Sequence, residues 1–173
     1  MHPRAAHLVQ QLRLEPHPEG GFFRQLFRSS DAVTPADGRG TRTALTTIYF
    51  LLPRNDVSRW HRVASDEVWH FYEGTPLEIW TATPNLSDLS VSRLGPLGDD
   101  AAPVTVVPAG WWQAAKPTGD YALVGCTVAP GFEFADFVLA RVVGSYAFAL
   151  KSRYPEIAPN GTAVRASTFA SSR

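Results

Sequence analysis

The stretch from Val57 to Gly74 holds the residues whose types and spacing could do chemistry. Side chains alternate between the two faces of a strand. If two strands here form a hairpin through residues 63–66, His61 and Glu67 meet on one inner surface. A neutral imidazole beside a carboxylate is either half of a metal site or a general acid–base pair. His70 falls on the opposite face and is therefore a poor candidate.

The same alternation supplies candidates for a ligand pocket. It places an arginine on the face of His61 and two aromatic residues on the face of Glu67. After the turn at residues 108–110, only one of two adjacent tryptophans shares a face with the glutamine that follows them. Large aromatics also fill small barrels simply because of their size, so core packing is an equally good interpretation. The expected ligand-binding set is Arg59, Trp69, Phe71, Trp111 and Gln113.

Two further residues complete the candidate site. Tyr49 is expected to line the pocket as an acid opposing His61, whereas Ile48 and Phe50 would face away. The alternative for a strand tyrosine is core packing with its hydroxyl at the rim. Arg24 could clamp a carboxylate or phosphate, although exposed surface charge is the commoner fate of an arginine.

Ten strands and two helices are expected to position these residues. Apolar spacing predicts a short helix from Pro3 that ends by Leu14, and Ser145 is a good N-cap for a second helix to about Arg153. Turns rich in Gly and Pro recur every 10 to 20 residues between the strands and leave no room for a βαβ unit. Residues 159–173 are small and polar and are expected to fray. The expected strands are Phe22–Arg28, Leu45–Leu52, Val57–His61, Glu67–Tyr72, Leu77–Thr81, Leu89–Leu94, Val104–Val107, Trp111–Ala115, Tyr121–Val128 and Phe134–Val142.

Composition limits the partners. The 173 residues carry 16 Lys plus Arg against 16 Asp plus Glu, a net charge of zero, which argues against nucleic acid and membrane surfaces. Of the 16 basic residues 14 are arginine, which suits anion contacts but also follows from codon bias. No segment resembles a signal peptide or a membrane span, so a single cytoplasmic domain is expected. The one cysteine, Cys126, lies in an apolar run and is expected to be buried.

The chain resembles the cupin superfamily, whose motifs are G-x5-H-x-H-x3-4-E-x6-G and G-x5-P-x-G-x2-H-x3-N. His61 matches the second histidine, and Glu67 and Gly74 match the glutamate and the closing glycine. Residues 108–113 match P-x-G-x-x-H, with glutamine in place of the last histidine. Arg59 stands at the first histidine, and the spacing from His61 to Glu67 is one residue longer than usual.

A closer resemblance is to the uncharacterised cupin family DUF985, also called cupin-5, from about Leu8 to Tyr154. It implies an all-β cupin double-stranded β-helix, a jelly-roll barrel over about residues 20–143, with a short helix at each end. It also implies a small-molecule ligand and a homodimer in which N-terminal strands cross to the partner. Members have been compared with sugar-nucleotide epimerases and sugar isomerases on the grounds of fold alone. The matching stretches are His17–Arg24, Thr47–Leu52, Ser58–Gly74, Pro108–Trp111 and Pro130–Phe137.

Three functions remain open at this point. The first is a metal-independent isomerase or epimerase that acts on a sugar or keto metabolite through His61 and Glu67, without a cofactor. The second is a metal-dependent enzyme in which His61, Glu67 and Gln113 hold a divalent transition metal; an inward Arg59 would disfavour that ion by on the order of several kcal/mol. A shift of one residue would turn Arg59 out and Ser58 in. The third is a ligand-binding module without turnover.

Overall fold

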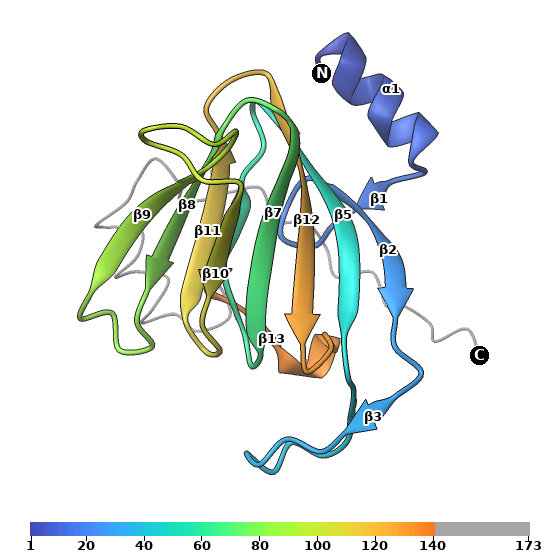
Figure 1. The fold of residues 1–173 in the computed structure, drawn as a ribbon, viewed down its shortest axis with the longest axis vertical. Coiled ribbons are helices and arrows are strands. Elements are labelled where there is room, and N and C mark those ends of the chain that lie inside the picture. The colour runs from blue at the N-terminus through green and yellow to red at the C-terminus, as the bar shows by residue number, and fades with distance from the viewer. Residues whose placement is uncertain (141–173) are drawn as a thin grey trace.

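A computed structural model describes residues 1–140 of the chain (Figure 1). The second helix expected at Ser145–Arg153 and the tail at 159–173 lie outside the described residues. Helix α1 (Pro3–Gln11) confirms the expected first helix, and the imidazole Nδ1 of His2 caps it by accepting from the Arg4 amide. No helix within residues 1–140 is both long and apolar enough to cross a membrane.

The strands agree closely with those expected, and all their ladders are antiparallel. Three two-residue strands, Glu15–Pro16, Ala32–Val33 and Arg42–Thr43, were not expected. The strand expected at Phe134–Val142, of which residues 141–142 lie outside the described part, is shorter, because a 3-10 turn at Phe134–Asp136 precedes Phe137–Leu139. One sheet has the order β1-β2-β5-β12-β7-β10, the other β13-β6-β11-β8-β9, and β3 pairs with β4 in a separate arm. The strands are β1 (Glu15–Pro16), β2 (Phe22–Arg28), β3 (Ala32–Val33), β4 (Arg42–Thr43), β5 (Thr46–Pro53), β6 (Ser58–Val63), β7 (Asp66–Gly74), β8 (Leu77–Ala82), β9 (Leu89–Leu94), β10 (Val104–Val107), β11 (Trp112–Pro117), β12 (Tyr121–Ala129) and β13 (Phe137–Leu139).

The two large sheets pack face to face, as Figure 1 shows, and this is the arrangement of a cupin jelly roll with one short helix. Alternate residues of the strands meet between the sheets in an apolar cluster that includes Phe50, Trp69 and Ile79. Helix α1 covers the outer face of β5 and β12, where Leu8 packs with Leu51. The central strands β5 and β12 are therefore apolar on both faces, which removes the alternation that would reveal their inward side.

The expected hairpin between the strands of His61 and Glu67 is wrong. β6 pairs with β11 and β13, whereas β7 pairs with β12 and β10, so consecutive strands belong to opposite sheets. His61 and Glu67 still share one inner surface, because they face each other across the barrel rather than along a ladder.

A β-bulge interrupts β6 beside the site. Gln113 of β11 lies opposite His61 and Ala115 lies opposite Ser58, so two residues of β6 face one residue of β11. Because of the extra residue, Ser58 and His61 point to the same inner face although an odd spacing separates them. The bulged Trp60 packs in the outer cluster of its sheet.

Candidate functional site

A cavity of about 90 Å³ opens between the two sheets at the end where β6 and β7 carry His61 and Glu67. Its walls are mostly apolar, and its polar groups are two histidines, two glutamates, a glutamine, a threonine and a thiol. Such a mixture of apolar walls and a few convergent polar groups is usual for a small-ligand site. The lining residues are His17, Glu19, Phe23, Gln25, Thr46, Ile48, Phe50, His61, Val63, Glu67, Cys126, Val128, Phe132, Phe134 and Phe137.

A tight turn before β2 brings Glu19 to the cavity. The turn closes through hydrogen bonds from the His17 amide to the Gly21 carbonyl and from the Gly20 amide to the His17 carbonyl, both 3.0 Å. Gly20 has φ +122°, and a Cβ there would lie 2.2 Å from the Val57 carbonyl oxygen. Only glycine permits both the backbone angle and this close approach to the start of β6. The turn therefore delivers Glu19 directly beside β6.

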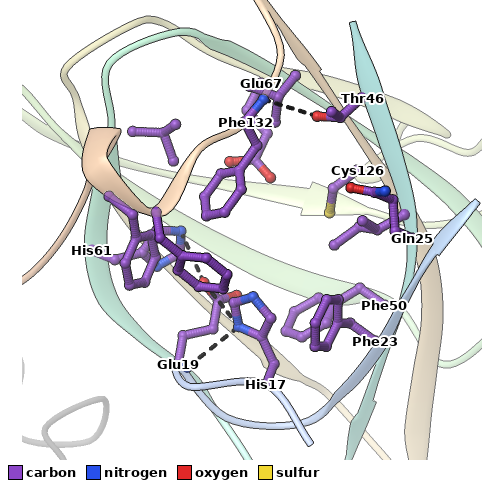
Figure 2. Close-up of a pocket in the computed structure, with 15 residues that line it drawn as sticks. His17, Glu19, Phe23, Gln25, Thr46, Phe50, His61, Glu67, Cys126 and Phe132 are labelled. Carbon is purple, nitrogen blue, oxygen red and sulfur yellow. Dashed lines mark hydrogen bonds and ion pairs between the residues drawn. The ribbon is translucent and has the colours of Figure 1, made fainter. Parts of the chain in front are cut away.

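The Glu19 carboxyl group is fixed between two imidazoles. Its Oε1 accepts a 2.8 Å hydrogen bond from the Ser58 hydroxyl, so the inward turn of Ser58 holds the carboxyl group in place. Its Oε2 lies 3.3 Å from His61 Nε2 and 3.6 Å from His17 Nδ1. Figure 2 shows these three side chains gathered together, with Cys126 and Gln25 on the opposite side of the cavity.

The hydrogen bonds around His61 place its protons. Nδ1 lies 2.8 Å from the Arg59 carbonyl oxygen, which can only accept, so Nδ1 carries a hydrogen. His17 Nδ1 accepts from the Glu19 amide at 3.3 Å and therefore carries none. The contact between His61 Nε2 and Glu19 Oε2 is favourable only with a proton between them. His61 and Glu19 thus share one transferable proton, at the part of the cavity wall that these two residues form.

Glu67 is held on the opposite side of the barrel. Its Oε2 accepts a 2.6 Å hydrogen bond from Gln113 Nε2, and Gln113 Oε1 accepts a 3.0 Å bond from Trp69 Nε1. Both atoms of the Gln113 amide are therefore engaged, and the amide orientation is fixed by having one donor and one acceptor as partners. The Cys126 thiol also hydrogen-bonds the Glu67 carboxyl group, so a ligand at Glu67 would share that carboxyl group with Gln113 and Cys126.

Burial shifts the titration of these groups. Desolvation raises the pKa of Glu19 and of Glu67 and lowers the pKa of His61 and of His17, so the uncharged forms are favoured in each case. Cys126 is buried, as expected, and desolvation followed by the nearby Glu67 raises the pKa of its thiol, which disfavours the nucleophilic thiolate. Carboxyl groups with a raised pKa are suited to proton transfer near neutral pH.

Aromatic side chains close the remaining side. Residues 132–137, here called the strap, bring Phe132, Phe134 and Phe137 to the cavity, and their rings pack edge to face with one another. Arg42 of β4 holds the strap through two bonds to Asp136, of 2.7 and 2.8 Å. Because Phe134 remains exposed while it lines the cavity, this is the side from which a ligand can approach.

Arg59 does not line the cavity. The bulge turns Ser58 inward in its place, and the Arg59 guanidinium donates to the Pro18 carbonyl at the edge of the turn. The expectation from strict alternation is therefore wrong for Arg59, because alternation fails wherever a strand gains a residue. Its charge still reaches the site electrostatically, since it lowers the pKa of His17 after the larger effects of desolvation, Glu19 and His61.

Tyr49 and Arg24 also lie outside the cavity. Ile48 and Phe50 line it, so the expected facing of β5 is wrong by one residue. Tyr49 packs in the cluster under α1 and meets Tyr72 with ring centroids 5.9 Å apart. The Arg24 guanidinium donates to the Leu12 carbonyl at 2.9 Å, where it caps the end of α1, and its neighbour in β2, Gln25, faces the cavity instead.

The expected aromatic residues lie inside the barrel but behind the cavity wall. Trp69 is buried in the inner cluster, and Phe71 and Trp111 pack against it. Trp112 is buried on the outer face under Arg62, so Trp111 is the inner tryptophan of the pair. The expectation that Trp69, Phe71 and Trp111 line the ligand pocket is nevertheless wrong. These residues support the site, because Trp69 orients Gln113, without forming its surface.

Sequence reasoning missed Glu19 and His17. Both belong to a turn, and strand alternation assigns no direction to turn residues. The available signal is the composition of residues 17–21, because a histidine and a glutamate between prolines and paired glycines mark a rigid turn with chemical groups.

The donors expected for a metal do not fit one. Gln113 Oε1 is occupied by the Trp69 N–H, and Gln113 Nε2 points at Glu67. Within residues 1–140, no group of three or more His, Cys, Asp and Glu side chains is arranged to hold a metal ion. The set of His61, Glu67 and Gln113 therefore offers two donors rather than three.

Comparisons with known proteins agree with this architecture. The sequence matches the family described as Cupin superfamily (DUF985) over residues 6–140. A crystal structure of a protein from Shewanella oneidensis is similar at 34% identity and a TM-score of 0.77, covering 90% of this chain and 97% of that one. A hypothetical protein from Leishmania major is similar at 28% identity and a TM-score of 0.76, covering 88% of this chain and 93% of that one.

A more distant likeness shows the fold alone. Oxalate decarboxylase from Bacillus subtilis is similar at 12% identity and a TM-score of 0.54, covering 81% of this chain and 34% of that one. No curated protein matches the sequence.

Proposed function

Since the chain belongs to the DUF985 family of the cupin superfamily, we propose that its barrel binds a small carbonyl compound and catalyses proton transfer on it as an isomerase or epimerase. The observation that carries this proposal is the pair of buried carboxyl groups on opposite sides of one cavity. Glu19 shares a proton with His61, and Glu67 faces them across the cavity. Opposed groups of this kind can remove a proton at one side of a substrate and supply one at the other.

The chemistry follows from the positions of the protons. With the substrate C–H directed at Glu67, the ionised carboxylate accepts the proton from the carbon next to the carbonyl. The proton shared by His61 and Glu19 passes to the carbonyl oxygen and gives an enediol. Isomerisation is completed when Glu67 returns its proton to the former carbonyl carbon and the other hydroxyl of the enediol gives its proton back to the His61–Glu19 pair, which forms the new carbonyl. Return of the proton to the original carbon exchanges its hydrogen with solvent. Gln113 keeps Glu67 in position throughout, and no metal ion takes part.

The volume of the cavity limits the substrate. A cavity of about 150 Å³ accepts benzene, which has six non-hydrogen atoms, so in proportion 90 Å³ encloses about four. A slightly larger compound would extend through the open side beside Phe134. A nucleotide sugar is far larger than this. The proposed substrates are therefore short hydroxy-aldehydes and hydroxy-ketones, within the expected class of sugars and keto metabolites.

Solvent exchange tests the proposal. Purified protein in D₂O is mixed with hydroxyacetone, glycolaldehyde or glyceraldehyde, and deuterium at the carbon next to the carbonyl is followed by NMR. We expect exchange above the rate in buffer that is lost in His61→Asn and in Glu67→Gln. Tyr49→Phe is the matched control, because this residue lies outside the cavity and should leave exchange unchanged.

The outcomes separate the three functions. No exchange with any of these compounds, together with retained binding, would favour a module without turnover. Metal in stoichiometric amount by elemental analysis that disappears in His61→Ala would favour the metal-dependent enzyme. Because we propose a homodimer, the exchange rate and the metal content are both expressed per protomer.

A further inference from the structure

The charged residues that line the cavity indicate which net charge its ligand can have. Of the described residues that line it, none is an arginine or lysine, and two are glutamates. The five phenylalanine rings of the wall offer no hydrogen-bond donor to a negative group. An anion that enters would lose its hydration and meet no positive partner, which is strongly unfavourable.

The arginines near the cavity are committed elsewhere. The Arg59 guanidinium donates to the Pro18 carbonyl. The Arg42 guanidinium donates to both oxygens of the Asp136 carboxylate. Arg28 pairs with Glu133 on the strap. None of these three cations lines the cavity. Arg28 and Arg42 are paired with carboxylates, and Arg59 keeps its charge beside the turn of His17 and Glu19.

The polar groups inside the cavity are suited to an uncharged ligand. The proton shared by His61 and Glu19 is a donor at one end. The Glu67 carboxyl group, which Gln113 and Cys126 already hydrogen-bond, and the Thr46 hydroxyl lie among the other lining groups. The Thr46 hydroxyl oxygen accepts a 2.9 Å hydrogen bond from the Phe132 amide, so the hydrogen of the Thr46 hydroxyl remains available to a ligand. A carbonyl and a hydroxyl group on adjacent carbons match a donor and an acceptor on opposite walls.

We infer that the barrel selects uncharged hydroxy-carbonyl compounds and rejects phosphates and carboxylates of the same size. The inference rests on the proposed function for the place where the ligand sits, and it adds the charge class of that ligand. A reaction that removes phosphate, or one that reduces a carboxylate, would be needed to supply such a compound from the common charged metabolites.

A matched pair of ligands tests the inference by binding alone. Hydroxyacetone and pyruvate share the acetyl group and differ in whether the remaining carbon is a neutral CH₂OH or a carboxylate. Binding of each to the full chain is measured at pH 7 by ligand-detected NMR and by shifts of the protein amide signals. We expect pyruvate to bind roughly 100-fold more weakly than hydroxyacetone, or not at all. Dihydroxyacetone against its phosphate gives a second pair.

Two variants make the test specific. Glu67→Gln keeps the shape and replaces a carboxyl group that can ionise, and then repel an anion, by an amide that cannot. We therefore expect the preference for hydroxyacetone over pyruvate to become smaller, at least about fivefold. Arg24→Gln should leave the preference unchanged, because the Arg24 guanidinium binds the Leu12 carbonyl outside the cavity. Equal affinity for pyruvate and hydroxyacetone, or pyruvate binding that is lost in Arg59→Gln, would overturn the inference.

Failure of this inference and failure of the proposed function are distinguishable. Binding affinity reports the discrimination between ligands, and deuterium exchange reports proton transfer. If the protein binds hydroxyacetone selectively but catalyses no exchange, the inference about ligand charge stands and only the proposed catalysis fails. Exchange on pyruvate as fast as on hydroxyacetone would retain the catalysis and overturn the charge class.

Discussion

The buried Gln113 amide holds two parts of the site together, and Gln113→Leu removes both of its bonds with little change in volume. The side chain is only 1% exposed, so water has little access to the groups left behind. Losing the neutral bond from Trp69 costs about 1 kcal/mol, and losing the bond to the Glu67 carboxyl group costs about 1 to 3 kcal/mol. We therefore expect the free energy of unfolding to fall by about 2 to 4 kcal/mol.

Urea unfolding at pH 7 measures this loss. Far-UV circular dichroism is the appropriate signal, because the substitution changes the surroundings of Trp69 and would alter tryptophan fluorescence without unfolding. Trp69→Phe and the double variant complete a thermodynamic cycle, in which the Trp69–Gln113 bond should appear as a coupling of about 1 kcal/mol. Proton exchange on hydroxyacetone should also slow in Gln113→Leu, since Glu67 loses the group that orients it.

A loss of stability below about 1 kcal/mol, with no coupling to Trp69, would refute the reasoning, because it would mean that the amide bonds carry no net free energy. A variant of normal stability and unchanged exchange would also remove Gln113 from the description of the site.

Three further predictions concern pH, the core and the strap. Burial raises the pKa of Glu67, so the folded state keeps a proton that the unfolded chain loses above the ordinary glutamate pKa of 4.5. The stability that protonated Glu67 contributes is therefore complete below pH 4.5 and declines as the pH rises. In urea unfolding, wild type should lose stability relative to Glu67→Gln by up to about 1.4 kcal/mol for each unit of rising pH. Ile79→Ala, at a fully buried position, should cost about 2 to 5 kcal/mol in the same assay, whereas Val91→Ala, at an exposed one, should change stability by less than about 0.5 kcal/mol. Arg42→Ala should accelerate amide hydrogen exchange of the strap by removing its bonds to Asp136, and exchange rates indistinguishable from wild type would show that those bonds do not restrain it.

The sequence predicted the strands well, because their ends are marked by glycine and proline turns and by apolar alternation. Phe22–Arg28 and Leu89–Leu94 begin and end in the structure at the expected residues. The face of a strand was harder to predict. On β5 both faces are buried, one by the opposite sheet and one by α1, so nothing in its composition marks Ile48 as inward and Tyr49 as outward.

Prediction of the site depended on the motif more than on geometry. His61 and Glu67 were found because their types and spacing are unusual, and they do face one cavity, but by way of opposite sheets rather than the expected hairpin. Glu19 was not found, because its approach to His61 depends on a turn docking across a distance of about forty residues in sequence, and no local pattern encodes such a contact.

The bulge in β6 has a consequence for comparing sequences of this fold. An alignment without gaps places Arg59 at the first histidine of the cupin motif H-x-H, which suggests that a cation has replaced a ligand. In space the inward-facing residue that precedes His61 is Ser58, and Arg59 or Trp60 is an insertion opposite Ala114. A gap of one residue at this point of β6 therefore aligns equivalent positions, and Arg59→Gln in this chain is a change at an inserted residue rather than at a ligand position.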